Sequence, residues 1–434
     1  MTTPAIATRS FPVDSFLQSN PTIKFVRYQW VDYAGILRTR VLTTSHFRRL
    51  VLSSSPLAMS PVALTATTVS QFIPGFIPTG VDHVYPDLSS LRPLLYAPDY
   101  AAVMCFVYEG IGEAGFSRCP RTILSNIASR GKDLDIKVGF ELEFRCLNPD
   151  GTSLDDCMAS WSSSAAMRNC CWPIIEEIVK TLTLSGIEVY QFHSEGTKGM
   201  FEISTGPLPV LEAVDNWIYT RETIKALFFK HNIIATFHPS PQEQHHGTGA
   251  HFHVSISAPE STCDSFLAGI LERLPAVCGF ALPLEASYKR VNDFKSEVGA
   301  YVAWGTENRD VPIRKIRPGR WEVRSCDATA NMYLALAGYL GSGIQSIQNN
   351  AELVWKDCIG RPSGEDAAWR ASTGIVKRLP TNLSESLQAL RESDWVDLGM
   401  QSAATTFAKI KEQEITLLRK MPEDDLRAIM IRYF

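Results

Sequence analysis

Hydrophobic and polar residues alternate over the first hundred positions in the pattern of short β-strands. Residues 23–32 (IKFVRYQWVD) alternate, DYAG supplies turn residues, and residues 36–42 (ILRTRVL) alternate again, which is typical of a β-hairpin. Apolar stretches at 82–96 and 100–108 predict further short strands. We interpret residues 1–20 as a loose arm, and the Gly-rich stretch after residue 109 as the end of a small domain.

The rest of the chain alternates predicted strands with predicted helices, without an internal repeat or a low-complexity segment. A length of 434 residues favours two domains. We therefore expect an N-terminal arm over 1–20, a small domain over 21–112 and an α/β domain over 113–434. Helical periodicity is clear at 120–131, 164–185, 209–231, 264–280, 327–349, 381–392 and 400–418.

Four predicted strands of the larger domain carry ionisable side chains spaced by two residues. Strand side chains alternate between two faces, so each set projects from one face. A sheet with one solvated face is the alternative interpretation, but such faces usually mix Lys, Thr, Ser and Gln. The sets are Glu141 and Glu143 in GFELEF; Glu202 in MFEIS, with Glu195 upstream in FHSEG; His251, His253 and Ser255 in GAHFHVSIS; and Arg320, Glu322 and Arg324 in RWEVRS.

If these segments converge, their carboxylates repel one another by about 4 kcal/mol per pair at 4 Å and an effective dielectric near 20. Divalent cations neutralise such a cluster, and glutamates with one imidazole suit Mg²⁺ or Mn²⁺. Arginines suit phosphate and carboxylate groups. The pattern therefore predicts metal-assisted phosphoryl transfer. No Walker loop and no G-x-G-x-x-G after a strand occurs, so neither common phosphate-binding loop holds the nucleotide.

Composition and charge narrow the classes of partner. The net charge is −4, without a basic block, which disfavours nucleic acid or an anionic membrane. No apolar run approaches the ~20 residues of a membrane span, and the N-terminus lacks the apolar core of a signal peptide. The ten cysteines include no C-x-x-C pair, and we expect mostly buried, reduced thiols. These features predict a cytoplasmic protein.

A series of motifs in a fixed order resembles the glutamine synthetase family, in the type I-like branch that includes fungal FluG-type domains. The resemblance spans about residues 22–420. It begins with VRYQWVDYAGILRTRV and VYPDLSSLR in the small domain. It continues through GFELEF, FHSEGTKGMFEI, ATFHPSP, GTGAHFHVSI, ASYKR, WGTENRDVPIR and RWEVRSCDATANMYLAL.

The resemblance implies an α+β protein with a small N-terminal β-grasp domain and a large C-terminal catalytic domain of the glutamine synthetase/guanidino kinase type. It also implies ATP as co-substrate, two Mg²⁺ or Mn²⁺ ions per site, and a homo-oligomeric ring in which the small domain completes a neighbour's site. The implied metal ligands are Glu143, Glu195 and Glu202 near the substrate, and Glu141, His251 and Glu322 near the ATP phosphates.

The same resemblance implies roles for seven further residues. Arg290 and Arg324 would bind the substrate carboxylate, and the backbone of Gly247 would approach the substrate amino group. Arg309 and Arg314 would face the phosphates, with Ser255 near the nucleotide. Glu297 lies one residue from the position of the family's flap glutamate, which shields the acyl phosphate, and we place it with Arg309 among the catalytic residues.

Four substitutions depart from the family's motifs around the substrates. They are Met200 for an amide in G-Q-x-E, Ser240 for lysine in P-K-P, Ala286 for asparagine in N-S-Y-K-R, and His246 before the G-T-G turn. The metal and phosphate positions keep the family's residues.

The leading hypothesis is an ATP-dependent amide-forming ligase that activates a carboxylate, the γ-carboxylate of glutamate, as an acyl phosphate. The alternatives are a true glutamine synthetase, a non-catalytic ring protein with a signalling or developmental role, and a guanidino-kinase-like phosphotransferase. A scaffold has no need of a repulsive carboxylate cluster, and a plain phosphotransferase leaves the small domain unexplained.

The amine acceptor is predicted to be larger than ammonium. Ammonia-using members need an acidic residue on a loop of the small domain, yet no Asp or Glu occurs between Asp32 and Asp82. The loop at 63–80 contains hydroxyl, apolar and proline residues, which pair badly with a small cation. Its candidate contacts to an apolar amine are Phe72, Ile73, Phe76 and Ile77. The alternative is that this loop is only a subunit contact and that Glu297 supplies the acid.

Overall fold

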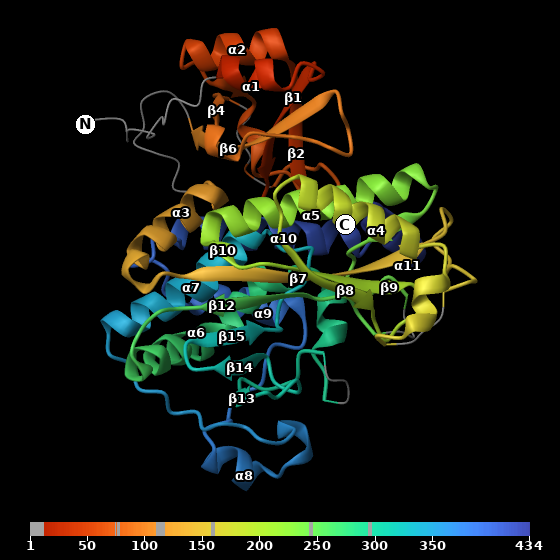
Figure 1. Ribbon diagram of the computed structural model, residues 1–434. Coiled ribbons are helices and arrows are strands. Elements are labelled where there is room, and N and C mark those ends of the chain that lie inside the picture. The colour runs from red at the N-terminus through yellow and green to blue at the C-terminus, as the bar shows by residue number, and fades with distance from the viewer. Residues whose placement is uncertain are drawn as a thin grey trace.

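Two separate β-sheets divide the chain, one before residue 110 and one after residue 136 (Figure 1). The computed structural model describes residues 13–73, 75, 79–109, 118–157, 161–242, 246–293 and 297–434. The predicted boundary between residues 112 and 113 lies outside the described residues, so it stays a prediction. None of the helices in these described ranges is long and apolar enough to cross a membrane.

The small sheet is built on the predicted hairpin. Its strand order is β2-β1-β6-β4-β3, with β5 beside β6; β6 runs parallel to β1 and antiparallel to β4. Two helices and two 3₁₀ turns accompany the sheet. The elements are α1 (Val13–Ser19), β1 (Phe25–Val31), β2 (Leu37–Thr43), α2 (Thr44–Leu52), β3 (Leu57–Met59), η1 (Pro61–Ala63), β4 (Asp82–Pro86), η2 (Leu88–Ser90), β5 (Arg92–Pro93) and β6 (Tyr100–Glu109).

Part of the predicted loose arm is helical, which corrects the interpretation of residues 1–20. Residues 13–19 form α1, in which Val13 and Phe16 are buried. Asp14 of α1 forms an ion pair with Arg48 of α2, with Oδ1 and Nε 2.5 Å apart. A single apolar pair three residues apart is too short a pattern to identify a helix from sequence, so only the packing against α2 reveals it.

The large sheet has the strand order β13-β14-β15-β12-β7-β9-β8, with β10 and β11 also paired to β7. Its pairings are antiparallel except for the parallel pair β13–β14. The long central strand β7 thus receives polar strands on both sides. The strands are β7 (Lys137–Leu147), β8 (Val189–Ser194), β9 (Met200–Thr205), β10 (Leu208–Pro209), β11 (Ile234–Thr236), β12 (Ala250–Ser255), β13 (Trp304–Thr306), β14 (Ile313–Arg317) and β15 (Arg320–Val323).

Helices cover the apolar face of this sheet, and the small domain lies above them (Figure 1). The α-helices after residue 119 are α3 (Pro120–Arg130), α4 (Trp172–Leu184), α5 (Val210–Lys230), α6 (Glu260–Ala281), α7 (Met332–Gln348), α8 (Ala367–Ser372), α9 (Leu383–Glu392), α10 (Gln401–Leu418) and α11 (Glu423–Tyr433). The 3₁₀ turns are η3 (Lys132–Leu134), η4 (Ser164–Arg168), η5 (Glu285–Arg290) and η6 (Pro362–Gly364).

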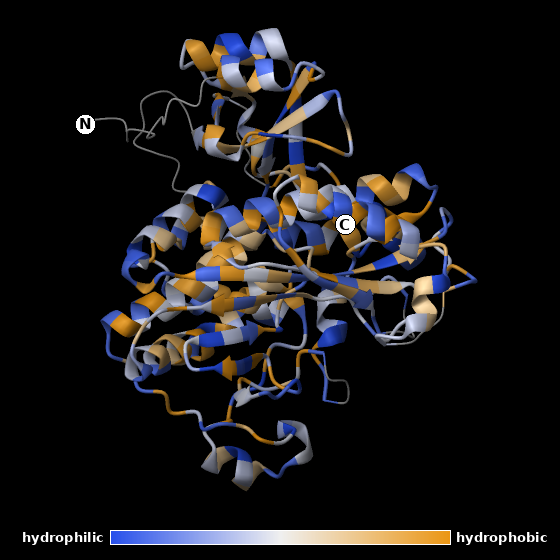
Figure 2. Ribbon diagram, in the orientation of Figure 1, coloured by the Kyte–Doolittle hydropathy of each residue, from blue (hydrophilic) through white to orange (hydrophobic). Residues whose placement is uncertain are grey.

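Alternation along the central strands separates an apolar face from a polar one (Figure 2). Phe140 of β7 packs on Trp217 of α5, with ring centroids 6.0 Å apart, and Phe252 of β12 packs on Tyr339 of α7 at 5.4 Å. Glu141, the neighbour of Phe140, therefore points to the opposite face. Burial of the aromatic face fixes the direction of the ionisable side chains.

Two predicted helices are shorter than their sequence patterns indicate. The pattern at 327–349 becomes a helix only at Met332, because the Asn331 side chain caps α7 and binds the backbone of Val31 and Asp32 in the small domain. The pattern at 164–185 divides into η4 and α4. Between them the Asn169 side chain accepts hydrogen bonds from backbone N–H groups at the start of α4.

The hairpin turn of the small domain fits closely against the segment before α7. Gly35 has a positive φ of 86°, and a side chain there would collide with the Thr329 carbonyl. Arg121 of α3 joins the two parts by ion pairs to Asp87 and Asp215, each 2.7 Å long. These buried contacts hold the small sheet on the helices of the larger region.

Candidate active site

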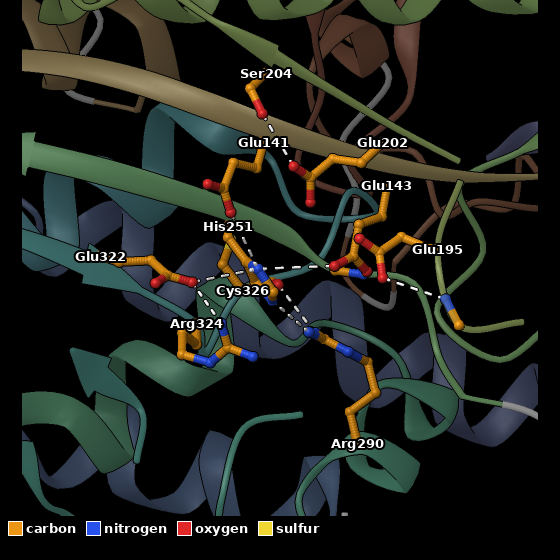
Figure 3. A network of polar contacts seen from close by, with 12 residues as sticks. Glu141, Glu143, Glu195, Glu202, Ser204, His251, Arg290, Glu322, Arg324 and Cys326 are labelled. Carbon is orange, nitrogen blue, oxygen red and sulfur yellow. Dashed lines mark hydrogen bonds and ion pairs between the residues drawn. The ribbon is translucent and has the colours of Figure 1, made fainter. Parts of the chain in front are cut away.

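The strand register brings the predicted ionisable residues together on one face of the large sheet (Figure 3). Glu141 of β7 lies opposite His251 of β12, and Glu143 lies opposite Glu202 of β9. Glu322 of β15 lies next in the sheet beyond β12. Residues from four separate segments therefore form one polar cluster.

Glu141, His251 and Glu322, here named the Glu322 triad, have potential ligand atoms within 4.8 Å of one another. His251 Nδ1 lies 3.6 Å from Glu141 Oε2 and 3.6 Å from Glu322 Oε1. Arginines surround the triad: Arg314 Nη1 is 2.8 Å from Glu322 Oε2, and Arg324 Nη1 is 2.5 Å from Glu322 Oε1. The carboxylate of Glu322 thus has two arginine partners.

Both carboxyl groups of the Glu322 triad have lowered pKa values. Burial tends to raise the pKa of Glu141, but hydrogen bonds with His251 and His253 outweigh it and hold this pKa below the ordinary range. For Glu322, burial is likewise opposed by the charges of Arg324 and His251, so its pKa is lowered. The triad is anionic at neutral pH.

A second acidic group lies beside the first and contains Glu143, His193, Glu195 and Glu202, here named the Glu202 group. His193, Glu195 and Glu202 have potential ligand atoms within 4.8 Å of one another. The imidazole of His193 lies 3.4 Å from Glu195 Oε1 through Nδ1 and 3.4 Å from Glu202 Oε1 through Nε2. Glu143 accepts a hydrogen bond from the backbone N–H of Gly249.

The carboxyl groups of Glu195 and Glu202 have raised pKa values. Burial, together with the charges of Glu143 and Glu202, raises the pKa of Glu195 to about 7. Burial and the charges of Glu141 and Glu143 raise the pKa of Glu202, although its hydrogen bond with His193 opposes the change. That same hydrogen bond is the main cause that raises the pKa of His193 to about 9. The raised pKa values favour the protonated forms of His193, Glu195 and Glu202, and a bound cation would displace those protons.

His193 is a member of the site that the sequence analysis missed. It stands two residues before Glu195 in FHSEG, at the end of β8, so strand alternation places it on the same face. That spacing was the available signal. His193 stands apart in the sequence from the six of nine histidines that fall within 231–253.

The G-T-G turn is packed against Arg290, which is 1% exposed. A side chain at Gly247 would approach Arg290 Cγ to 2.7 Å, and one at Gly249 would approach His251 Nε2 to 2.6 Å, so both positions require glycine. Arg290 Nη1 donates to the Cys326 carbonyl at 2.9 Å. Its Nε is buried and has no hydrogen-bond partner among the described residues, which leaves a donor for an anion.

Glu297, the candidate flap residue, lies at the same turn. The backbone N–H of Gly247 donates to Glu297 Oε1 at 3.2 Å, and His246 Nδ1 lies 3.0 Å from the same oxygen. His246, one of the departures from the family's motifs, is therefore a partner of the candidate flap residue.

Two predicted phosphate-site residues are not joined to the cluster by direct contacts. Arg309 is exposed and forms no hydrogen bond or ion pair with another described residue. Ser255 ends β12 on the face that also carries His251, beyond His253. Arg314, by contrast, is held in place by Glu307 as well as by Glu322.

Two of the motif departures, Ser240 and Ala286, line a pocket of about 330 Å³ between η5, α10 and α11, away from the carboxylate cluster. Met200 is buried in β9, opposite Arg145 of β7. Two of the four contact predicted site residues: His246 lies against Glu297, and the Met200 carbonyl accepts from the backbone N–H of Glu195 at 2.8 Å.

The candidate amine loop is partly anchored to its own chain. The Thr68 hydroxyl donates to Glu414 Oε1 at 2.7 Å. Glu414 and Lys411 are buried residues of α10, and Lys411 Nζ lies 2.8 Å from Glu414 Oε2. Phe72 is 56% exposed, whereas Ile73 packs partly against the core. Phe76 and Ile77 lie outside the described residues, so their predicted contacts stay a prediction.

Comparison with known proteins identifies the family. The model of the glutamine synthetase catalytic domain matches residues 117–428 of this chain. The chain belongs to the glutamine synthetase family. The predicted family is thus confirmed, and ligases of this family use ATP and divalent metal ions.

Two curated glutamine synthetase relatives show how far the likeness extends. Protein fluG of Emericella nidulans is 34% identical over 97% of this chain, which spans 50% of that protein's length. Gamma-glutamylpolyamine synthetase GlnA3 of Streptomyces coelicolor is 29% identical over 83% of each protein.

A solved structure of a GmaS/ADP complex superposes with a TM-score of 0.83 at 23% identity, covering 95% of this chain and 98% of the other. The α+β class with a glutamine synthetase-type catalytic fold is therefore confirmed.

Proposed function

We propose that this protein is an ATP-dependent ligase that activates the γ-carboxylate of glutamate and couples it to an amine larger than ammonium. The carboxylate oxygen would attack the γ-phosphorus of ATP and ADP would leave, giving an acyl phosphate. The amine nitrogen would then attack the acyl carbon, and phosphate would leave. The observation that supports this chemistry is the paired acidic groups with arginines on one sheet face, in a member of a ligase family.

The donor atoms of both acidic groups fit hard divalent cations. Carboxylate oxygens with one imidazole suit Mg²⁺ or Mn²⁺. Burial and the neighbouring carboxylates raise the pKa values of Glu195 and Glu202, and a bound cation would favour their ionised forms. We assign one ion to Glu143, Glu195 and Glu202, with His193 beside them, and another to Glu141, His251 and Glu322. When bound, the ions would neutralise the phosphate charge that develops during transfer.

The arginines of the site would orient the substrates. Arg290 offers a buried, unused Nε donor for the α-carboxylate of glutamate, and Arg324 lies across the site beside Glu322. The backbone of Gly247 borders the same position. On the nucleotide side, Arg314 and the exposed Arg309 would meet phosphates, with Ser255 near the nucleotide. Arg314 would exchange its contact with Glu307 for a phosphate oxygen.

Glu297 would shield the acyl phosphate from water. Its carboxylate is held by the N–H of Gly247 and faces His246, at the turn that borders Arg290. A loop in this place can exclude water only after the substrate has bound.

The proposal of a larger amine rests on the small domain and on one relative. No acidic side chain is available in the loop before Asp82 to bind a small cation. A relative of similar length is a gamma-glutamylpolyamine synthetase. We further propose that the small domain completes a neighbouring subunit's site in a ring, so an isolated monomer would be inactive.

The test is release of ADP in the presence of glutamate and a panel of primary amines, diamines, polyamines and ammonium, with products identified by mass spectrometry. We expect turnover that EDTA abolishes and Mg²⁺ or Mn²⁺ restores, with kcat/KM higher for a larger amine than for ammonium. Glutamine formation from ammonium unmatched by any amine would identify a true glutamine synthetase. Absence of ADP release with every acceptor, in a folded and metal-loaded oligomer, would favour the non-catalytic alternative.

A further inference from the structure

A group of thiols lies outside the acidic groups, where the segment between β7 and α4 returns to the sheet. Cys157, Cys170 and Cys171 have sulfur atoms within 4.8 Å of one another. Cys157 and Cys171 are buried and Cys170 is exposed. Asp156 adjoins them: its carboxylate accepts from the Cys170 backbone N–H at 2.8 Å and lies 3.3 Å from Cys170 Sγ.

We propose that Cys157, Cys170, Cys171 and Asp156 form a structural Zn²⁺ site that holds this segment against the edge of the active site. Nothing in the proposed ligase chemistry requires these residues. The assignment is therefore independent of the proposed function.

The distances fit tetrahedral zinc. Two thiolates bound to one zinc at about 2.3 Å each are separated by about 3.8 Å. The Sγ atoms of Cys157 and Cys171 are 3.8 Å apart. A carboxylate oxygen at about 2.0 Å from the metal lies about 3.5 Å from a bound sulfur, close to the observed distance between Asp156 and Cys170. The three sulfurs would supply three ligands, and Asp156, which contacts Cys170, would supply the fourth.

The surroundings of the thiols also suit a metal. A further buried thiol, that of Cys146 at the end of β7, lies beside Cys171. The exposed side of the group, at Cys170 and Asp156, offers a path for the ion. A disulfide would use two of the sulfurs at about 2.05 Å and leave the third thiol and the carboxylate without a role.

The segment that carries these cysteines borders the Glu202 group. The backbone N–H of Ser162 donates to the Ser194 carbonyl at 2.8 Å, and Ser194 stands between His193 and Glu195 in sequence. Zinc at the thiols would thus fix the backbone beside Glu195, a proposed ligand of the catalytic metal, and beside His193. Its loss should loosen that backbone without removing any residue of the acidic groups.

The experiment is metal analysis of the purified full-length protein, with Co²⁺ substitution as a ligand-specific readout. We expect about one Zn²⁺ per chain and, with Co²⁺, the intense charge-transfer absorption of cobalt thiolate bonds, which carboxylate and imidazole ligands do not produce. The exposed-residue variants Cys170→Ser and Asp156→Asn should bind Zn²⁺ at least tenfold more weakly. The double variant Cys157→Ser/Cys171→Ser should lose the cobalt absorption.

The matched control is Cys105→Ala, a buried thiol in β6 of the small sheet, which should keep the zinc and the cobalt spectrum. Three results would each overturn the proposal: no cobalt thiolate absorption in the unaltered protein, unchanged zinc affinity in both exposed-residue variants, or a Cys157–Cys171 disulfide found by mass spectrometry in protein purified under reducing conditions. The exposed-residue variants keep the test decisive even if the double variant fails to fold.

Discussion

The Glu322 triad and the Glu202 group lie side by side on one sheet face, but different basic side chains face their carboxylates. Glu322 has two arginines within 2.8 Å, so its negative charge is compensated inside the protein. Among the described residues, no arginine forms an ion pair with the Glu202 group, and His193 is the basic side chain that faces Glu195 and Glu202. The pKa of Glu322 is accordingly lowered, whereas that of Glu195 is raised to about 7.

This difference predicts that the Glu202 group depends more on a bound cation for its stability than the Glu322 triad does. Carboxylates beside arginines remain ionised and ordered without a metal ion. Carboxylates that face one another repel, and either protonation or binding of a divalent ion relieves that repulsion. We therefore expect loss of either group to lower turnover equally. In the metal-free protein, we expect neutralising Glu322 to lower the free energy of unfolding and neutralising Glu202 to leave it unchanged or raise it.

Turnover should change most, and by the same factor for a variant in either group. Glu202→Ala and Glu322→Ala should each lower kcat by about a thousandfold or more, because each removes a ligand that positions the charge-neutralising ion. ADP release at saturating Mg²⁺, with folding checked by circular dichroism, measures this loss. The exposed Glu188→Ala is the matched control and should stay near the unaltered rate. Substantial turnover in either ligand variant would remove that residue from the metal site.

The next effect separates the two groups by the free energy of unfolding in EDTA. Glu322→Gln should lose about 3–5 kcal/mol, because it leaves the buried Arg324 and the half-buried Arg314 without their shared partner. Glu202→Gln should be unchanged or gain about 1 kcal/mol, because it removes one like charge beside Glu143. Urea unfolding of the two variants measures both values. Losses of similar size would show that the two groups are balanced in the same way.

The smallest effect is the pH dependence of stability and metal binding. The raised pKa of His193, about 9, contributes stability that is complete below its ordinary value of 6.5 and is lost as pH rises through 9. The raised pKa of Glu195, about 7, means that its ionised form is disfavoured, so stability also falls as pH rises through 7. The metal-free protein should therefore melt at a lower temperature at pH 9 than at pH 6.

Binding of Mn²⁺ should show the opposite trend, since the ion displaces those protons. Its apparent affinity should fall by up to about tenfold per pH unit below pH 7. Calorimetric titration at pH 6, 7 and 8 tests this dependence, and Glu195→Gln should flatten it. An affinity for Mn²⁺ that is independent of pH in the unaltered protein would contradict the protonated state of the Glu202 group.

Much of the fold follows from local patterns in the sequence. The hairpin at 23–42 and the strands around Glu141, Glu202, His251 and Glu322 form where alternation predicts them. Helix ends were less predictable, because α7 begins only where Asn331 caps it and contacts the small domain. The helix α1 depends on its packing against α2, which no local pattern encodes.

Alternation is a property of neighbouring residues, so the sequence alone predicts which side chains share a strand face. It also establishes that no acidic residue lies between Asp32 and Asp82. The grouping of the ionisable residues depends on the folded chain, because strand pairing joins segments far apart in the sequence. That pairing placed Glu143 opposite Glu202 and Arg314 opposite Glu322, brought His193 into the site, and left Arg309 outside the cluster. The balance of charge in each group follows from those distances.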